Sequence, residues 1–479
     1  MNYTFLTISP DTCSVNKQLC IYLSINPPHR YFMKKNNPLI TGTIILTITG
    51  FASRFIGFFY RIFLSRVFGA EGMGLYQLTS PVLALTFSIT VSGIQTAISK
   101  FVASETTTHD YKSSFRTLFV GFIIAMTLSV GCTAYIYLFA DMIAGKLLFE
   151  PRTAPLLRII SLSIPMATVH SCINGYFYGI RKTSVPSLTQ LTEQIIRVGS
   201  VYLIYITYTS RGYTPTISFA VVGLVIGEAA SMIVSLIAIY QRFYSLTTSH
   251  FPIPKVKQSF SIYINDAKRL LSLAAPLSLN RTLINFLQSI EAIYIPQCLQ
   301  RYGYDNAKAL SVYGVLTGMA LPLILFPSAI TNSISVLLLP IVSEADSTGN
   351  QSAIRKAVRK SIKYCFLLGF LCTAIFLIFG RFAGMLLYNS SLAGSFIITL
   401  SFICPFMYIA STLNSILNGL GKTIHTFAFS MVSLLFRLLF VFLAIPVFGI
   451  QGYLWGLLAS QLMQTLLCIF AVRKYLVAG

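Results

Sequence analysis

Residues 174–183 read NGYFYGIRKT, and residues 414–423 read NSILNGLGKT, which is the same pattern 240 positions later. Two further pairs match in this register: Pro165 with Pro405, and Arg197 with Arg437. The chain therefore contains an internal repeat, and each copy of the repeat has an arginine inside an apolar stretch. Two similar halves with charge inside apolar segments are typical of a membrane transporter.

The composition predicts a membrane protein. Hydrophobic residues make up 55% of the chain and charged residues 10%, and the mean hydropathy is +0.73. Apolar runs of about 20 residues, enough to cross a ~30 Å hydrocarbon core as helices, recur along the sequence. We predict an all-α polytopic membrane protein with about 12 spans in two six-helix lobes. The expected spans are 38–63, 76–103, 114–139, 155–179, 186–208, 216–240, 269–297, 308–342, 361–379, 393–419, 424–446 and 450–472.

The formal net charge of +22 is distributed as the positive-inside rule expects, because Lys and Arg gather in alternate loops. This pattern predicts the cytoplasmic membrane of a bacterium as the location, with both termini cytoplasmic. Nucleic-acid binding is disfavoured because no basic patch is interleaved with aromatic residues for base stacking.

Four parts of the chain are expected. Residues 1–32 are a polar extension or precede the true start, 33–241 form the first lobe, 242–268 a cytoplasmic linker, and 269–479 the second lobe. Each lobe has an even number of spans, so both enter from the same face and the repeat is parallel. The eighth span is expected to be bent or broken, because it contains Gly314, Gly318, Pro322 and Pro327.

Two arginines lie in the first span and one in the seventh. Arg54 and Arg61 are one heptad apart on the same helical face, and Arg61 is near enough to the outer interface to snorkel. Arg281 begins a polar stripe that continues with Asn285 and Gln288. No acid lies near Arg54 or Arg281 in sequence, which favours a hydrated cavity as the environment of both. We therefore predict that these five residues bind substrate.

A second set of charges consists of Glu193, Arg197, Glu228, Glu291 and Arg437. A central arginine costs ~2.5–3.5 kcal/mol on membrane-insertion scales unless it is paired or hydrated. Glu193 and Arg197 are spaced i,i+4 and can pair, and Glu228 or Glu291 can face another arginine. Bracing of the lobes and lining of a cavity both remain open for this network.

An excess of arginine favours an anionic substrate, because the guanidinium fork matches phosphate oxygens and keeps its charge in apolar surroundings. His170 and His425 are lone histidines, for which packing or a local hydrogen bond is expected. No Walker A loop, nucleophile elbow or metal-ligand cluster appears in the sequence. We therefore expect no enzyme activity, no catalytic residue, no metal and no organic cofactor.

Several segments resemble one family specifically. Residues 50–61 (GFASRFIGFFYR), 65–76 (SRVFGAEGMGLY) and 93–100 (GIQTAISK) are similar to the stage V sporulation protein B family. Residues 313–322 and 339–345 resemble the same family in the second half. That family belongs to the multidrug/oligosaccharidyl-lipid/polysaccharide (MOP) flippase superfamily, so the resemblance implies a MATE/MOP-like fold over residues 33–479.

The resemblance implies export of a lipid-linked cell-wall precursor, an undecaprenyl-pyrophosphate saccharide such as lipid II, for peptidoglycan of the spore cortex. Related lipid II flippases have Arg-x-x-Gly-x-x-Arg-Asp in the first span. Arg54 and Gly57 match this motif, but Tyr60 and Arg61 stand where Arg-Asp is expected. The acidic partner is missing, and so is the pair of spans that lines a lipid-tail groove in those relatives.

We predict a flippase that works by alternating access, driven by a coupling ion (Na⁺ or H⁺) or the membrane potential. Its expected partners are a polyprenyl-pyrophosphate lipid, membrane lipids and cell-wall synthases. One alternative is a cation-coupled multidrug exporter of the same superfamily, which needs an acidic, aromatic cavity. The other is a membrane scaffold for wall synthesis that transports nothing.

Overall fold

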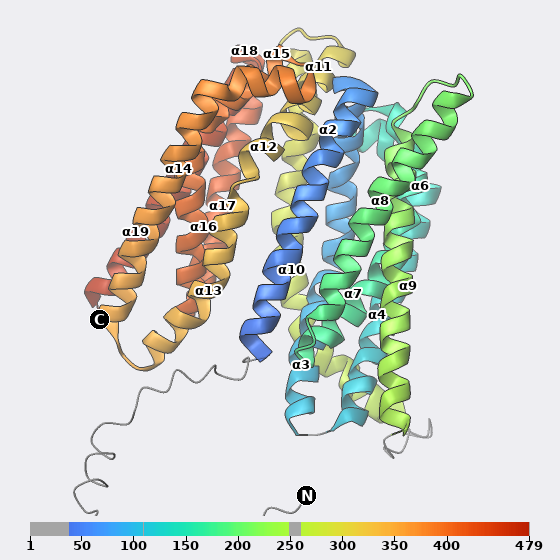
Figure 1. Ribbon diagram of the computed structural model, residues 1–479, viewed down its shortest axis with the longest axis vertical. Helices are drawn as coiled ribbons and strands as arrows, with labels where there is room; N and C mark the ends of the chain where they lie inside the picture. Colours follow the sequence, from blue (N-terminus) through green and yellow to red (C-terminus); the bar gives the residue numbers. More distant parts are fainter. Residues whose placement is uncertain (1–37, 109, 249–259, 479) are drawn as a thin grey trace, which may run out of the picture. The chain divides into compact units, whose positions relative to one another are not determined.

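Every regular element in the described residues is a helix (Figure 1). The computed structural model describes residues 38–108, 110–248 and 260–478. Residues 42–479 form one compact unit, and the account below concerns that unit. The extension expected at 1–32, and residues 249–259 of the expected linker, lie outside the described residues.

The helices follow one another with short connections. In chain order they are α2 (Pro38–Phe87), α3 (Gly93–Thr107), α4 (Tyr111–Leu138), α5 (Ala140–Met142), α6 (Ala154–Ser161), α7 (Ser163–Gly179), α8 (Ser184–Ser210), α9 (Ser218–Thr248), α10 (Phe260–Arg301), α11 (Asn306–Gly314), α12 (Leu321–Leu325), α13 (Ser328–Ser347), α14 (Gln351–Tyr388), α15 (Ser391–Ser401), α16 (Cys404–Gly419), α17 (Thr423–Leu439), α18 (Ile445–Phe448) and α19 (Ile450–Ala478). Short π-helical turns join several of these pieces, at Ser88–Ser92, Ile143–Leu147, Val315–Ala320 and Phe440–Ala444.

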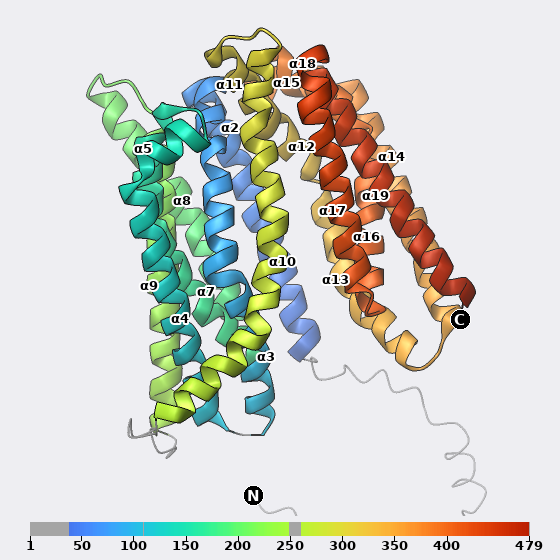
Figure 2. The same cartoon turned by 180° about the vertical axis from the view of Figure 1, so that it is seen from behind.

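Two bundles stand side by side (Figures 1 and 2). Helices α3–α9 form the first bundle and α11–α19 the second, with α2 and α10 between them. Helix α10 belongs to both cores. Leu270 and Ala274 near its start are buried with Ile94 and Tyr176 of the first bundle, and Ile295 near its end is buried with residues of α11 and α15–α19.

Eight helical stretches of the described residues are long and apolar enough to span a membrane, or up to ten if each bent helix pair is one span. One of the eight, Ile45–Thr107, is 63 residues long, far more than the ~20 residues that one crossing needs. It breaks at Gly69, whose φ of 69° places it outside the helical region. If this stretch is counted as two crossings and α8 is counted as one more, the ten spans become the expected 12 or so.

The expected break in the eighth span is confirmed. The helix passes through the π-helical turn Val315–Ala320, and α12 ends at Leu325 just before Pro327. Each proline lacks the N–H of a regular helical bond, and a π-helical turn frees a carbonyl, so the direction of the chain changes here. Because of this break, Pro322 and Ser328 lie at the space between the bundles.

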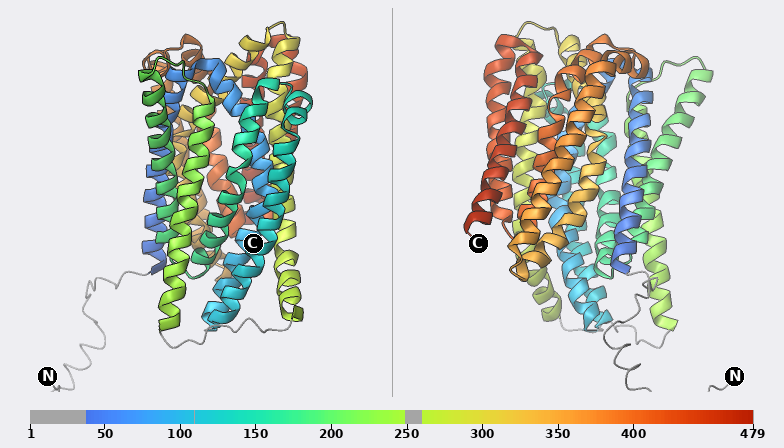
Figure 3. Two further views of the ribbon diagram at one scale, coloured as in Figure 1. Left: turned by 90° about the vertical axis from the view of Figure 1, so that its right-hand side faces the viewer. Right: turned by 60° about the vertical axis from the view of Figure 1, so that its left-hand side comes forward.

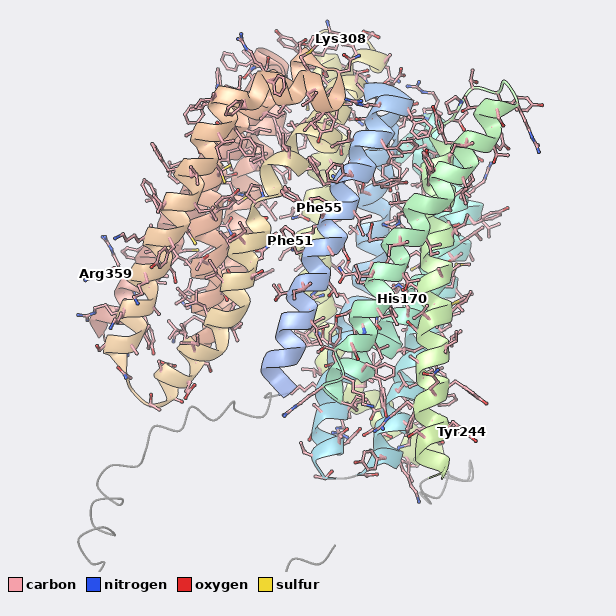
Figure 4. All side chains as sticks on the ribbon, in the orientation of Figure 1. Phe51, Phe55, His170, Tyr244, Lys308 and Arg359 are labelled. Carbon is pink, nitrogen blue, oxygen red and sulfur yellow. The ribbon has the colours of Figure 1, made fainter. Side chains whose placement is uncertain are left out.

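The two ends of the unit differ in charge. We call "basic end" the end with the turns at 180–183, 348–350 and 420–422, where most of the loop lysines and arginines lie. Figure 4 shows Tyr244 and Arg359 toward this end and Lys308 at the opposite end. Helices α2 and α13 diverge toward the basic end in Figures 1 and 2.

At the opposite end α2 and α11 are in close contact. A Cβ placed on Gly314 would overlap the carbonyl oxygen of Ala70 and the backbone of Gly74. A Cβ on Gly74 would likewise overlap the carbonyl of Leu310. Small residues allow two helix backbones to approach in this way within a membrane.

Polar contacts support the same junction. Glu150, in the connection before α6, is 2% exposed and accepts a 2.7 Å hydrogen bond from the side-chain amide of Asn306 in α11. Arg152 bonds both Glu150 (2.7 Å) and Glu71 (2.6 Å). Arg66 of α2 donates to the carbonyls of Leu386 and Leu387, where the last turn of α14 has unpaired acceptors. The bundles are therefore joined at the end opposite to the basic loops.

We predict that Gly314→Val destabilises the protein, because the added side chain must displace the backbone of α2. Overpacking of this kind costs about 1–3 kcal/mol. Gly131→Val is the matched control, since no atom lies within 4 Å of a Cβ at Gly131. Thermal unfolding in detergent should show a lower midpoint for Gly314→Val alone; equal midpoints would contradict the close contact.

A second prediction concerns pH. Burial raises the pKa of Glu150, but hydrogen bonds from Arg152 and Asn306 outweigh it, so that the pKa lies below the ordinary 4.5. A depressed pKa stabilises the fold fully above the unfolded value, and this stabilisation is lost as pH falls through the folded value.

Wild type should therefore unfold at a higher temperature than Glu150→Gln at pH 7, with the gap closing below about pH 4. The exposed Asp141 at the same end supplies the control variant, Asp141→Asn. A gap for Glu150→Gln that is constant from pH 7 to pH 3 would rule out this role of the carboxylate.

Candidate functional site

A cavity of about 440 Å³ lies between the two bundles. Helices α2 and α8 form one wall and α12–α13 the other, and we call it the arginine cavity. Its polar lining residues are Ser53, Arg54, Arg61, Gln190, Gln194, Ser328 and Asn332. No carboxylate is among the residues that line it. The cavity is thus polar and carries positive charge from α2 alone.

The spacing on α2 explains this wall. Arg54, Gly57, Phe58 and Arg61 recur at helical intervals and face the same side. Arg54 is exposed and Arg61 half-buried. Neither has an ion-pair or hydrogen-bond partner among the described residues. A central arginine without a partner is tolerated in a membrane where it meets water, so water is expected in this cavity.

Aromatic side chains connect the two walls. Phe326, at the break between α12 and α13, has its ring centroid 5.2 Å from that of Phe58, 6.0 Å from Phe51 and 6.3 Å from Phe55. Figure 4 shows Phe51 and Phe55 on α2 at mid-height. The arginines therefore stand beside an apolar, aromatic surface that joins the two bundles.

The three residues of the polar stripe predicted on α10 do not share one environment. Arg281 is exposed and has no hydrogen-bond or ion-pair partner among the described residues, but it does not line the arginine cavity. Asn285 donates a 3.0 Å hydrogen bond to the carbonyl of Ala84, next to the π-helical turn of the second span. Asn285 thus joins two helices, and only Arg281 and Gln288 of the stripe have exposed side chains.

A second cavity, of about 300 Å³, lies within the second bundle and contains Gln288, Thr317 and Gln461. It adjoins the arginine cavity, because Leu325 lines both. Glu291 lies in its wall and accepts hydrogen bonds from Arg437 (2.5 Å) and the Tyr453 hydroxyl (2.6 Å). One buried acid thus meets one buried base, and the pair is neutral overall.

The first bundle has a corresponding charged group, which we call the acid–histidine cluster. Arg197 forms an ion pair with Glu193 and lies 3.5 Å from Glu228. His170 Nε2 lies 2.7 Å from the other oxygen of Glu228. Figure 4 shows His170 at mid-height in the bundle. Two carboxylates face one arginine here, so with a neutral His170 the cluster has one formal negative charge more than its counterpart around Arg437.

The cluster has the geometry of a cation site. One ligand atom from each of His170, Glu193 and Glu228 can lie within 4.8 Å of the others. Arg197 already occupies part of the carboxylate surface, however. A proton or a monovalent cation suits one unbalanced charge better than a divalent metal ion does.

Sequence reasoning missed two kinds of contact. His170 was expected to be a packing or locally bonded residue, yet its partner Glu228 is 58 residues away. Asn332 and Ser328 belong to no polar stripe that the sequence shows. They line the arginine cavity because the break between α12 and α13 turns the chain toward it. Gln190, by contrast, lies three and seven residues before Glu193 and Arg197, a helical spacing that the sequence shows.

We predict that Glu291→Gln destabilises the protein, because it leaves the buried Arg437 without a counter-charge. Removing one partner of a buried pair costs about 3–5 kcal/mol, whereas replacing both by apolar groups is often near neutral. The double variant Glu291→Leu/Arg437→Met, which replaces both charged groups by apolar ones, should therefore recover most of the loss in a thermal-unfolding assay.

The exposed pair Arg158–Asp141 gives the control for this experiment. Asp141→Asn should cost no more than about 1 kcal/mol. A single variant Glu291→Gln as stable as Asp141→Asn would show that the pair around Arg437 is not a buried ionic pair.

Comparison with known proteins identifies the family. The model of the family described as Polysaccharide biosynthesis protein matches residues 39–346. Stage V sporulation protein B of Bacillus subtilis (strain 168) is 28% identical over 441 residues, which is 91% of this chain and 84% of that protein. The Lipid II flippase MurJ of the same bacterium is 23% identical over 342 residues, 68% of this chain and 62% of that protein.

Solved structures agree on the fold. An inward-facing multidrug resistance MATE family transporter of the MOP superfamily superimposes with a TM-score of 0.67 at 16% identity, covering 89% of this chain and 95% of that one. A MOP superfamily transporter from Pyrococcus furiosus, whose title reports a binding pocket of reverse polarity, gives 0.63 at 15% identity, covering 93% and 97%. The predicted family and the MATE/MOP-like helical fold are thus confirmed. The chain belongs to the polysaccharide biosynthesis protein family of multi-pass membrane proteins and has the fold of MOP-superfamily transporters.

Proposed function

We propose that this protein is a flippase for an anionic, lipid-linked cell-wall precursor, a polyprenyl-pyrophosphate saccharide of the lipid II type. The observation that carries the proposal is the arginine cavity. It lies between the two bundles, has Arg54 and Arg61 in one wall, and has no carboxylate in its lining.

The chemistry of the cavity suits a pyrophosphate. A guanidinium keeps its charge and offers two parallel N–H donors to phosphate oxygens. Gln190, Gln194 and Asn332 add neutral donors that suit sugar hydroxyls and phosphate oxygens. An organic cation would meet two like charges there with no acid in compensation, which disfavours a drug-exporting role for this cavity.

Alternating access fits the contacts between the bundles. The contacts of Gly74, Glu150 and Arg66 join the two bundles at one end, while α2 and α13 diverge toward the basic end (Figure 2). The positive-inside rule places the basic end in the cytoplasm, with both termini there. In this orientation the arginine cavity faces the side on which lipid-linked precursors are made, and the contacts at the far end open to release them.

Energy coupling is supported by the acid–histidine cluster. Its extra negative charge favours uptake of one H⁺ or Na⁺ in an apolar bundle, and the second bundle's Glu291–Arg437 pair lacks this imbalance. Arg281 stands exposed on α10 and is available to a headgroup in a different arrangement of the bundles. The likeness to Stage V sporulation protein B supports peptidoglycan of the spore cortex as the destination and wall synthases as neighbours.

We predict that Arg54→Ala lowers the translocation of fluorescent lipid II in proteoliposomes by about 10-fold or more, since a charge-assisted hydrogen bond contributes about 1.5–3 kcal/mol. Arg61→Ala should act in the same direction. Arg54→Lys should recover only part of the activity, because the two-pronged contact is lost.

The matched control is Arg359→Ala, an exposed arginine outside the cavity. Full translocation by Arg54→Ala and Arg61→Ala would refute the site. Wild-type protein that binds lipid II without moving it would support the scaffold instead. Drug resistance on overexpression, with no effect on lipid II, would favour the multidrug exporter.

A further inference from the structure

An apolar pocket of about 380 Å³ lies on the outer side of the first bundle. Its walls are aromatic and aliphatic side chains of α4 and α9, among them Phe115, Phe119, Phe122, Leu236, Ile239 and Phe243. Ile173 of α7 lies at its base and Tyr263 of α10 at one end. The arginine cavity shares none of these residues.

The pocket exists because α4 and α9 do not pack closely on each other. Both pack extensively against α7, which leaves a wedge between them on the side shown in the left view of Figure 3. The rings of Phe115 and Phe243 meet edge to face across the wedge at 5.7 Å. The pocket is therefore an open groove between α4 and α9, which we call the α4/α9 groove, and the two helices meet there only through an aromatic contact.

Its length matches one leaflet of a bilayer. Lys112 and Phe122 mark its two ends on α4, and ten residues of helix rise about 15 Å. This is half of a ~30 Å hydrocarbon core. A single hydrocarbon chain that enters from the basic end would fill the groove without crossing the membrane midplane.

The mouth of the pocket is basic. Lys112 and Arg116 lie there, one turn apart on α4. Arg116 is paired with Asp266, whereas Lys112 is exposed and makes no ion pair within the described residues. Tyr244 and Tyr263 lie at the same end, where aromatic side chains favour the membrane–water interface. A lipid whose chain lies in the groove would bring its phosphate to Lys112.

The substrate is not the expected occupant. Helices α4 and α9 lie on the side of the first bundle away from α12 and α13 (Figures 1 and 2), whereas the arginine cavity lies between α2, α8 and those two helices. A precursor bound through its pyrophosphate in that cavity would have to pass around the bundle to reach this groove. A resident membrane lipid needs no such path.

We propose that the α4/α9 groove is a binding site for an anionic glycerophospholipid of the leaflet at the basic end, with one acyl chain between the aromatic walls and the phosphate at Lys112. One juxtamembrane lysine strengthens the binding of an anionic headgroup by about 5-fold. The site is independent of the transported precursor.

Native mass spectrometry of the purified full chain tests the site, with dioleoyl phosphatidylglycerol and dioleoyl phosphatidylcholine as probes. Wild type should retain one phosphatidylglycerol at least 5-fold more tightly than phosphatidylcholine. Lys112→Glu should remove this preference. Leu236→Trp, which fills the groove from an exposed position, should weaken retention of both lipids.

Two variants serve as controls. Ile237→Trp adds the same bulk on the neighbouring exposed residue outside the groove, and Lys360→Glu makes the same charge reversal on α14; both should bind like wild type. Equal retention by Leu236→Trp and Ile237→Trp would overturn the proposal. So would displacement of phosphatidylglycerol by undecaprenyl phosphate, which would assign the groove to the transported lipid.

Discussion

A guanidinium inside a membrane must be paired with an acid or kept in contact with water, because its insertion without either costs several kcal/mol. This constraint organises the described helices. Arg197 and Arg437, the pair related by the internal repeat, lie inside their bundles and are matched with carboxylates. Arg54 and Arg61 have no such partner, and they lie at the cavity between the bundles. Pairing thus occurs within the bundles, and water is expected between them.

The two repeated halves are similar in sequence, but the groups around their matching arginines differ in charge. Arg437 meets one carboxylate, and Arg197 meets two together with a histidine. With a neutral His170, the first bundle therefore has one formal negative charge that the second lacks. The arginine cavity has the opposite sign. Helix α8 carries residues of both sites, Glu193 and Arg197 in the cluster and Gln190 and Gln194 in the cavity wall. We infer that this shared helix can link movement of a cation in one site to movement of an anion in the other.

The sequence predicts much of the fold, and less of the site. Apolar runs of membrane length predict the helices, because such runs depend on local composition, and the 240-residue repeat predicts two similar halves. Pro322 and Pro327 predict the break in the eighth span for the same reason. Contacts between distant helices carry no local signal: the bond between His170 and Glu228, the use of Asn285 as a helix-to-helix contact, and the place of Asn332 in the cavity all follow from packing. Arg281 shows the limit of reading polar stripes: helical spacing identifies a polar face of α10, but it does not tell which cavity or helix that face contacts.

The central claim is that the space beside Arg54 is wet and electropositive. The rate of modification of a single cysteine at Asn332, in a background with the native cysteines replaced, measures both properties. Methanethiosulfonate reagents of opposite charge should react at different rates, the anionic ethylsulfonate faster than the cationic trimethylammonium, after normalisation to a free thiol. Arg54→Gln should reduce that ratio. A faster reaction with the cationic reagent, or a ratio unchanged by Arg54→Gln, would contradict the account.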